Sequence, residues 1–169
     1  MSRYLLTAVA VLSTSLHGCG DGRPSLIKAT GTVLVDGQPV EGALVSFQPI
    51  AESKDGFKRP SAAVTDAGGK FELGTYEKTD GIPVGKYKVA IQKQELVGSL
   101  PPNYDPEKPG NFAVKYKWIV PKKYASIDSS GLEAEVTSSG LTPEKFDLQT
   151  GGEKPQVETS GQQRRGNEP

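Results

Sequence analysis

The chain is poor in the residue types that most enzymes use for catalysis. It contains one cysteine, Cys19, and one histidine, His17, which stand two positions apart near the N-terminus. A disulfide within the chain is excluded because it needs two cysteines. A metal centre built from several His and Cys ligands is excluded for the same reason. Any chemistry that requires an imidazole would depend on His17 alone.

The chain also lacks an excess of charge of either sign. Its 20 Lys and Arg residues balance 20 Asp and Glu residues, so the net charge is zero, and we expect no nucleic-acid partner. Glycine and proline are abundant instead, with 20 and 13 residues, which favours turns and short strands over long helices. A length of 169 residues fits one domain with tails.

Residues 1–18 have the three parts of an export signal. Arg3 supplies a positive charge, residues 4–16 form an apolar run of 13 residues, and the small residue Gly18 precedes Cys19. This run is too short to cross about 30 Å of hydrocarbon as a helix, which takes about 20 residues. We therefore predict a signal peptide over 1–18 that is removed from the mature protein.

The four residues Leu16, His17, Gly18 and Cys19 resemble the bacterial lipobox, in which a peptidase cuts before a lipid-modified cysteine. His17 departs from this pattern, which commonly has a small residue there. The resemblance implies lipidation at Cys19, a tether over 19–29 and the membrane as a partner. Two or three acyl chains would hold the protein firmly. Because no Asp directly follows Cys19, the analogy favours the outer membrane of the cell envelope.

Processing at this motif would change the chemistry available to the mature domain. Cleavage after Gly18 removes His17, and lipidation occupies Cys19. The mature domain then has no Ser-His-Asp or Cys-His triad and no histidine-ligated metal. We therefore expect no catalytic residue, no metal and no cofactor, and a protein that is not an enzyme.

Five segments show the alternation of apolar and polar residues that is typical of β-strands. They are 43–49, 69–74, 85–93, 132–137 and 145–149. In the first of them, Ala43, Val45 and Phe47 share one side. Such alternation requires sheets with one buried face, and Asp-Gly and Ser-Gly pairs supply turns between the segments. The sequence predicts an all-β domain of seven antiparallel strands in two packed sheets.

The segments "GTVLVDGQPVEGALVSFQP", "TDAGGKFEL" and "DGIPVGKYKVAI" resemble the carboxypeptidase regulatory-like domain. That domain is a transthyretin-like (prealbumin-like) Greek-key β-sandwich of seven antiparallel strands. The resemblance covers residues 30–149 and implies a non-catalytic module. Residues 150–169 lack aromatic residues and have almost no aliphatic ones, so we predict a disordered tail there.

Several glycines and aspartates have roles that the predicted fold explains. Gly31 and Gly42 fall where a side chain would crowd a turn or a neighbouring strand. The aspartates at predicted turns are Asp36, Asp66, Asp80 and Asp128. Their carboxylates are expected to cap turns. They leave open one alternative, a carboxylate- or metal-dependent hydrolase on the same fold.

One basic and aromatic segment is a candidate ligand-contact strip, which we call the 115–124 strip. It consists of Lys115, Tyr116, Lys117, Trp118, Lys122, Lys123 and Tyr124. Exposed aromatic rings beside cations could stack on sugars or contact an anionic envelope component. The other interpretation is that Trp118 and Ile119 close the end of the sandwich while the lysines face solvent.

The sequence thus favours a lipid-anchored, non-catalytic module of the bacterial envelope. Carbohydrate or another envelope protein is the expected partner. A second alternative, besides the hydrolase, is a secretion or transport accessory protein that recognises peptide by adding a strand at a sheet edge. An exposed and unprotected edge strand would favour that alternative.

Overall fold

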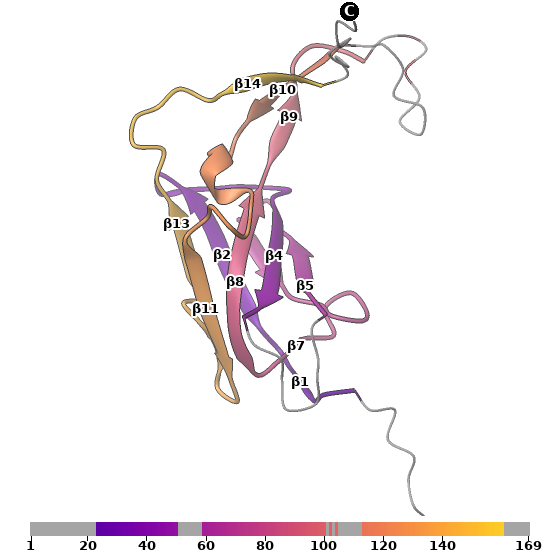
Figure 1. The fold of residues 1–169 in the computed structure, drawn as a ribbon, viewed down its shortest axis with the longest axis vertical. Helices are drawn as coiled ribbons and strands as arrows, with labels where there is room; N and C mark the ends of the chain where they lie inside the picture. The colour runs from indigo at the N-terminus through magenta and orange to yellow at the C-terminus, as the bar shows by residue number, and fades with distance from the viewer. Residues whose placement is uncertain (1–22, 51–58, 101, 103, 105–112, 161–169) are drawn as a thin grey trace, which may run out of the picture.

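The computed structural model describes residues 23–50, 59–100, 102, 104 and 113–160. These residues form an all-β fold with 14 strands and a single 3-10 turn, without any α-helix (Figure 1). None of the segments described is a helix long and apolar enough to cross a membrane. The lipobox-like residues Leu16, His17, Gly18 and Cys19 lie outside the described residues.

The strands form four sheets. In spatial order, the largest contains β12 (Gly140–Thr142), β11 (Leu132–Thr137), β8 (Gly85–Gln92), β4 (Leu44–Pro49) and β5 (Ser61–Val64). The second contains β13 (Lys145–Leu148), β2 (Thr30–Val35) and β3 (Gln38–Pro39), with β6 (Lys70–Glu72) also paired to β2. The third contains β14 (Val157–Ser160), β10 (Val114–Trp118) and β9 (Gln94–Leu96), and the fourth β1 (Leu26–Ile27) and β7 (Ile82–Pro83).

The five alternating segments predicted from the sequence are strands β4, β6, β8, β11 and β13. Their apolar residues point inward as expected, and Val45, Phe47, Val89 and Ile91 are fully buried. Polar residues of β8 and β11 face solvent, where Glu133 lies opposite Lys88 in the register of the two strands. Opposite charges at such positions stabilise a sheet modestly.

Phe47 lies where the two larger sheets meet. Its ring centroid is 6.3 Å from that of Phe71, 6.0 Å from that of Tyr87 and 6.1 Å from that of Phe146. Phe71 and Phe146 belong to the second sheet, whereas Phe47 and Tyr87 belong to the largest. The two sheets therefore share one core.

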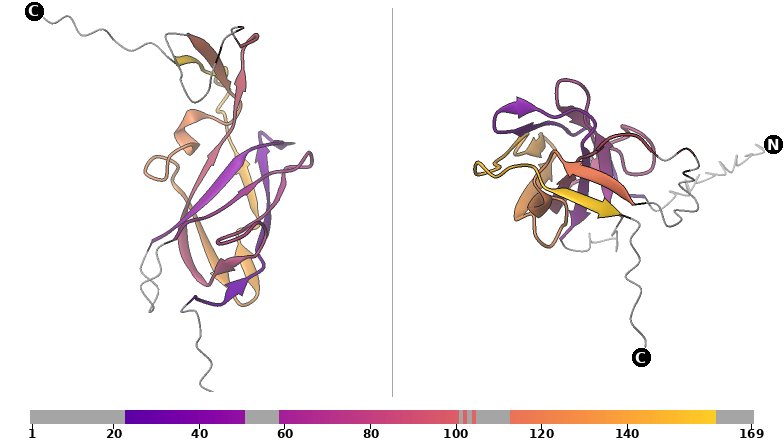
Figure 2. Two further views of the ribbon diagram at one scale, coloured as in Figure 1. Left: turned by 90° about the vertical axis from the view of Figure 1, so that its right-hand side faces the viewer. Right: turned by 90° about the horizontal axis from the view of Figure 1, so that it is seen from above.

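The two larger sheets are also joined along one edge. Ala62 of β5 and Gly74, just after β6, form an isolated antiparallel bridge. The connected sheets curl into a half-barrel (Figures 1 and 2). One strand pair departs from the antiparallel pattern that the sequence predicts, because β13 runs parallel to β2.

The structure explains why glycine occupies positions 31 and 42. A Cβ atom on Gly31 would lie 2.5 Å from Cζ of Phe71 and 2.8 Å from the carbonyl oxygen of Glu144. Gly42 has a φ of +66°, and its Cβ would lie 2.8 Å from Nζ of Lys93. Gly31 therefore permits close packing, and Gly42 permits a left-handed turn.

The predicted disordered tail over 150–169 differs from the structure in its first half. Residues 150–160 are described, and Val157–Ser160 form β14, antiparallel to β10. Disorder is predicted because this segment has few apolar side chains to bury. Strand β14 instead pairs with β10 through backbone hydrogen bonds, which do not require apolar side chains. Residues 161–169 lie outside the described residues.

The third sheet and the start of the described chain lie at opposite ends of the molecule. In Figure 1, β9, β10 and β14 stand above the half-barrel, and β1 lies at its lower end. Strand β9 follows β8 almost directly, and β14 follows β13 through residues 149–156. Each of the two larger sheets thus sends one strand into the third sheet.

Candidate functional site

Strand β10 divides the first part of the 115–124 strip between two faces. Lys115 and Lys117 are exposed, Tyr116 is half-buried, and Trp118 is 8% exposed. Successive side chains of a strand point to opposite faces, so the two lysines lie on one face and the two aromatic rings on the other. Residues 115–118 do not form one continuous surface of cations and rings.

The second part of the strip lies on the 3-10 turn η1 (Lys122–Tyr124). Nζ of Lys122 lies 5.9 Å from the ring centroid of Trp118 and forms an ion pair with the Glu158 carboxylate. Nζ of Lys123 lies 4.8 Å from the ring centroid of Tyr124. Tyr124 is half-buried against the main core. These contacts fit the interpretation in which the aromatic residues pack at one end of the domain.

Trp118 nevertheless lies outside the main core cluster. Its indole Nε1 is buried without a hydrogen-bond partner of regular geometry among the described residues. The Glu158 carboxylate is close by: its pKa is lowered by Lys122 first and by the indole of Trp118 second. The indole and the ammonium group therefore act on the same exposed carboxylate.

A small cavity of about 80 Å³ adjoins Trp118. It is lined by Trp118, Ile119, Pro121, Lys122, Lys123, Thr150, Glu153, Lys154, Pro155 and Gln156. One water occupies about 30 Å³, so the cavity takes two or three water-sized groups. Binding pockets for whole small molecules are commonly about 300–1,000 Å³. This cavity can hold one chemical group but not a sugar ring.

A much larger groove of about 1050 Å³ lies between the edges of the two larger sheets, and we call it the seam groove. Its walls are Thr30, Gly31, Thr32, Leu44, Ala62, Ala63, Val64, Thr65, Asp66, Lys70, Phe71, Glu72, Lys78, Thr79 and Glu144. None of these residues belongs to the 115–124 strip, and Asp66 is the one among them that the sequence predicts to be a turn carboxylate. Threonine hydroxyls, charged side chains and the exposed Val64 make its surface mixed in character.

The seam groove contains backbone groups that no strand pairs. The N–H of Thr65 donates to the carbonyl of Ala43, just before β4, so the N–H and C=O of Val64 point away from β4. Leu73 donates to the carbonyl of Ala29, so the corresponding groups of Glu72 point toward β5.

The unpaired groups lie between two closed ends of the β5–β6 hairpin. Ala62 and Gly74 exchange two backbone hydrogen bonds, and the N–H of Asp66 donates to the carbonyl of Lys70. Between these ends, the described strands β5 and β6 form no ladder with each other, since β5 pairs with β4 and β6 pairs with β2. The backbone N–H and C=O groups of Val64 and Glu72 therefore lie at the groove outside any ladder that the described strands form.

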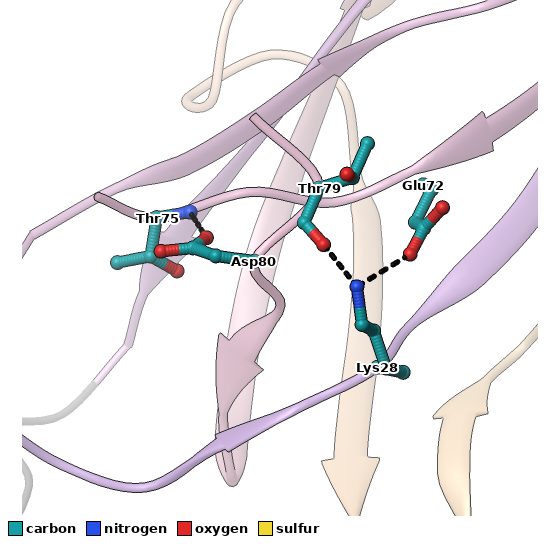
Figure 3. A network of polar contacts seen from close by, with 5 residues as sticks. All are labelled: Lys28, Glu72, Thr75, Thr79 and Asp80. Carbon is teal, nitrogen blue, oxygen red and sulfur yellow. Dashed lines mark hydrogen bonds and ion pairs between the residues drawn. The ribbon is translucent and has the colours of Figure 1, made fainter. Parts of the chain in front are cut away.

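A polar network fixes one side of the seam groove (Figure 3). Nζ of Lys28 donates to Oε1 of Glu72 at 2.9 Å and also to the carbonyl oxygen of Thr79. Nearby, the Asp80 carboxylate accepts a hydrogen bond from the backbone N–H of Thr75 at 2.6 Å. Glu72 and Thr79 both line the groove, so this network holds two of its wall residues in place.

Three of the four turn aspartates, Asp36, Asp66 and Asp80, hold the backbone with their carboxylates, as predicted. Asp36 accepts hydrogen bonds from the hydroxyl and the N–H of Thr150, which lower its pKa in that order. Asp66 accepts two backbone N–H groups at 2.8 Å. Burial raises the pKa of Asp80, but hydrogen bonds from the N–H groups of residues 75–77 outweigh it and leave the pKa below its ordinary value. These carboxylates are engaged by the fold.

The acidic side chains that the structure describes do not form a metal-binding cluster. Within the part of the chain that the structure describes, no group of three or more His, Cys, Asp or Glu side chains is arranged to hold a metal ion. The four turn aspartates considered in the sequence therefore do not converge on one point.

Comparisons with family models, with curated proteins and with solved structures found no match to this chain.

Proposed function

We propose that the protein is a lipid-anchored, non-catalytic module of the bacterial cell envelope that binds carbohydrate in the seam groove. In this proposal residues 30–149 are a transthyretin-like β-sandwich and Cys19 carries the lipid, with the outer membrane as the expected location. The observation that carries the binding proposal is the open groove between β5 and β6, two strands that form no ladder with each other at Val64 and Glu72.

The chemistry of the groove matches a polyhydroxylated ligand. A sugar hydroxyl both donates and accepts, so it can pair with an N–H, a C=O or a threonine hydroxyl. Thr30 and Thr79 supply such hydroxyls, and Lys78 supplies a cation. The only aromatic ring in the wall among the described residues, that of Phe71, is 4% exposed. Recognition therefore rests on hydrogen bonds rather than on stacking against a ring.

The non-catalytic part of the proposal is supported by the state of the carboxylates. A carboxylate-based hydrolase needs acidic groups that face a substrate with pKa values suited to proton transfer. Asp80 instead accepts three backbone N–H groups, and Asp36 is held by Thr150. Both pKa values are lowered, which favours permanently ionised structural groups.

The groove is tested by placing a large side chain in it. Val64 is 62% exposed and lines the groove, so Val64→Arg should fill the groove without disturbing the core. Val157→Arg is the matched control, because Val157 is 55% exposed on β14 at the far end of the molecule. Binding to soluble peptidoglycan fragments and to delipidated lipopolysaccharide would be measured by isothermal titration calorimetry.

We expect Val64→Arg to abolish the binding that wild type and Val157→Arg share. Equal binding by all three proteins would show that the seam groove is not the binding site. If wild type binds neither probe, the carbohydrate proposal is wrong. The double variant Trp118→Ala, Tyr124→Ala should bind like wild type, because these rings pack within the domain.

Anchoring is tested separately in cells. Cys19→Ala should move the protein from the membrane fraction to the soluble periplasmic fraction, since the variant has no thiol to lipidate. Retention of Cys19→Ala in the membrane fraction would show that lipid on Cys19 is not the anchor.

Peptide recognition by strand addition is a second candidate, which one observation favours. Strand β14 pairs only with β10 among the described strands, and the N–H of Trp118 donates to the carbonyl of Gln156. By alternation, the N–H of Thr159 points away from β10. Thr159→Pro would remove this donor while leaving the β10 pairing intact. The test is crosslinking of the protein to its partners in the envelope. This candidate is supported if an envelope protein that crosslinks to wild type and to Thr159→Val no longer crosslinks to Thr159→Pro.

A further inference from the structure

One residue of the seam groove, Thr79, has a backbone conformation that threonine disfavours. Its φ is +60°, in the left-handed region where the Cβ of an L-residue crowds the backbone. A β-branched side chain is rarely found there, whereas glycine adopts this region readily. The other described non-glycine residue with a positive φ is Asp36, in the Asp-Gly turn between β2 and β3, where such a conformation is usual. The backbone at Thr79 is therefore strained in a way that the backbone at Asp36 is not.

The loop of residues 74–81, between β6 and β7, holds Thr79 in this conformation. The Asp80 carboxylate accepts hydrogen bonds from the backbone N–H groups of residues 75–77, at 2.6 to 3.0 Å. Nζ of Lys28 donates to the carbonyl oxygen of Thr79 itself (Figure 3). Backbone strain persists only where surrounding contacts fix the conformation, and strained residues cluster at functional sites.

Close packing of the backbone also keeps this loop in place. A Cβ atom on Gly74 would lie 2.2 Å from the carbonyl oxygen of Glu77 and 2.7 Å from the backbone nitrogen of Thr79. At the base of the loop, the N–H of Gly81 donates to the carbonyl of Leu73 at 3.0 Å. All of these contacts with residue 79 involve its backbone, so a glycine at this position would satisfy them without strain.

The side chain of Thr79 has no hydrogen-bonding role within the described structure. Its hydroxyl makes no hydrogen bond to any residue that the structure describes. The residue is half-buried and forms part of the wall of the seam groove. A threonine at this position therefore strains the backbone without an internal hydrogen bond in return, and the groove is the place where its side chain can act.

We propose that Thr79 is a specificity-determining residue of the seam groove, whose hydroxyl bonds a hydroxyl group of the bound sugar and whose strained backbone is retained for that contact. This inference rests on the proposed carbohydrate binding. The hydroxyls of threonine and of a sugar both donate and accept, so they can pair in either direction. A site built around such a bond binds an analogue that lacks the partner hydroxyl much more weakly.

The strain also serves the binding step. Because the contacts within loop 74–81 fix the backbone of Thr79 before a ligand arrives, little conformational freedom is lost when the sugar binds. A glycine at position 79 would relax the backbone but would lack the hydroxyl. Stability and binding are therefore expected to change in opposite directions at this one position.

The first test measures the strain through stability, without any ligand. We expect Thr79→Gly to raise the urea concentration at the midpoint of unfolding, because glycine adopts a φ of +60° at no steric cost. The matched control is Thr137→Gly, the same substitution at an exposed position of strand β11. It should lower the midpoint, since glycine weakens a strand.

The second test measures the contact through binding. Thr79→Ala and Thr79→Ser both keep the Cβ atom, and they differ from each other in the hydroxyl alone. Titration calorimetry with soluble peptidoglycan fragments and delipidated lipopolysaccharide should show binding about five- to tenfold weaker for Thr79→Ala, the effect of one lost hydrogen bond. Thr79→Ser should bind like wild type. The control Thr159→Ala, on β14 at the far end of the molecule, should also bind like wild type.

Three outcomes would overturn the inference while leaving the groove proposal in place. They are a midpoint that does not rise in Thr79→Gly, binding by Thr79→Ala equal to that of wild type, and an equal loss of binding in Thr79→Ala and Thr79→Ser. Failure of the proposed function looks different, because wild type then binds neither probe or Val64→Arg binds as well as wild type. In that case the contact at Thr79 is wrong as well.

Discussion

Gly31 is a position where one added carbon atom has a calculable effect. A Cβ there would approach both the Phe71 ring and the Glu144 carbonyl to within 3 Å. We predict that Gly31→Ala lowers the free energy of unfolding by about 1–3 kcal/mol, the usual cost of overpacking a core. Urea denaturation measures this change. The control is Thr30→Ala on the same strand, where the side chain is exposed. A Gly31→Ala protein as stable as the Thr30→Ala protein would contradict the prediction.

Tyr87 couples the stability of the fold to alkaline pH. Its hydroxyl donates to the carbonyl of Pro83 at 2.7 Å, and burial raises its pKa from 10.0 to about 12. Because the pKa in the folded state is the higher one, the contribution of Tyr87 is complete below pH 10 and is lost as pH rises toward 12.

We predict that Tyr87→Phe lowers stability by about 0.5–1.5 kcal/mol at neutral pH, because it removes one buried hydrogen bond. The difference between wild type and Tyr87→Phe should shrink as pH increases from 10 toward 12. Urea unfolding at several pH values measures both effects. A difference that stays constant or grows over this range would contradict the assignment.

At the scale of elements, β14 determines the environment of the single tryptophan. The N–H of Trp118 donates to the carbonyl of Gln156, and β14 covers one edge of β10. We predict that removal of residues 150–169 exposes the indole, shifts its fluorescence to longer wavelength and leaves most of the half-barrel stability in place. Removal of 161–169 alone is the control and should change neither property. An unshifted spectrum in the longer truncation would show that β14 does not cover Trp118.

The strands that the sequence predicts are those that bury one face in the core. In segments such as 132–137, the alternation of apolar and charged residues indicates a strand with one face buried in the core and the other exposed to solvent. Strand β14 has the sequence "VETS" and pairs with β10 through the backbone over four residue positions. Backbone groups are the same in every residue, so no local pattern reveals such a strand.

The candidate sites were harder to predict than the strands. The division of the 115–124 strip could be predicted from the alternating order Lys115, Tyr116, Lys117, Trp118. If this segment is a strand, its side chains point alternately to the two faces, so the rings and the cations lie on opposite faces. The seam groove had no such signal. It lies where β5 and β6 form no ladder at Val64 and Glu72, and this absence of a ladder depends on how the two sheets curl together rather than on which residues they contain.

At the scale of the whole molecule, Phe47 holds the two larger sheets together. Its ring contacts rings from both sheets and is completely buried. We predict that Phe47→Ala lowers the free energy of unfolding by about 3–5 kcal/mol. This loss is a large part of the total free energy of unfolding of a typical domain, which is about 5–15 kcal/mol. Val64→Ala is the control, and since Val64 is largely exposed its effect should stay within about 0.5 kcal/mol. Urea denaturation distinguishes the two, and similar losses would contradict the shared core.

The parallel pairing of β2 with β13 gives the molecule a direction of mechanical resistance. The chain enters β2 at Thr30 and leaves β13 at Leu148, and the two strands pair over four residue positions. Tension applied between these points pulls the strands past each other in opposite directions. All the hydrogen bonds between them are then loaded together in shear and cannot open one after another. Single-molecule pulling between Thr30 and Leu148 should therefore require more force than pulling across the antiparallel hairpin of β11 and β12, which opens from one end.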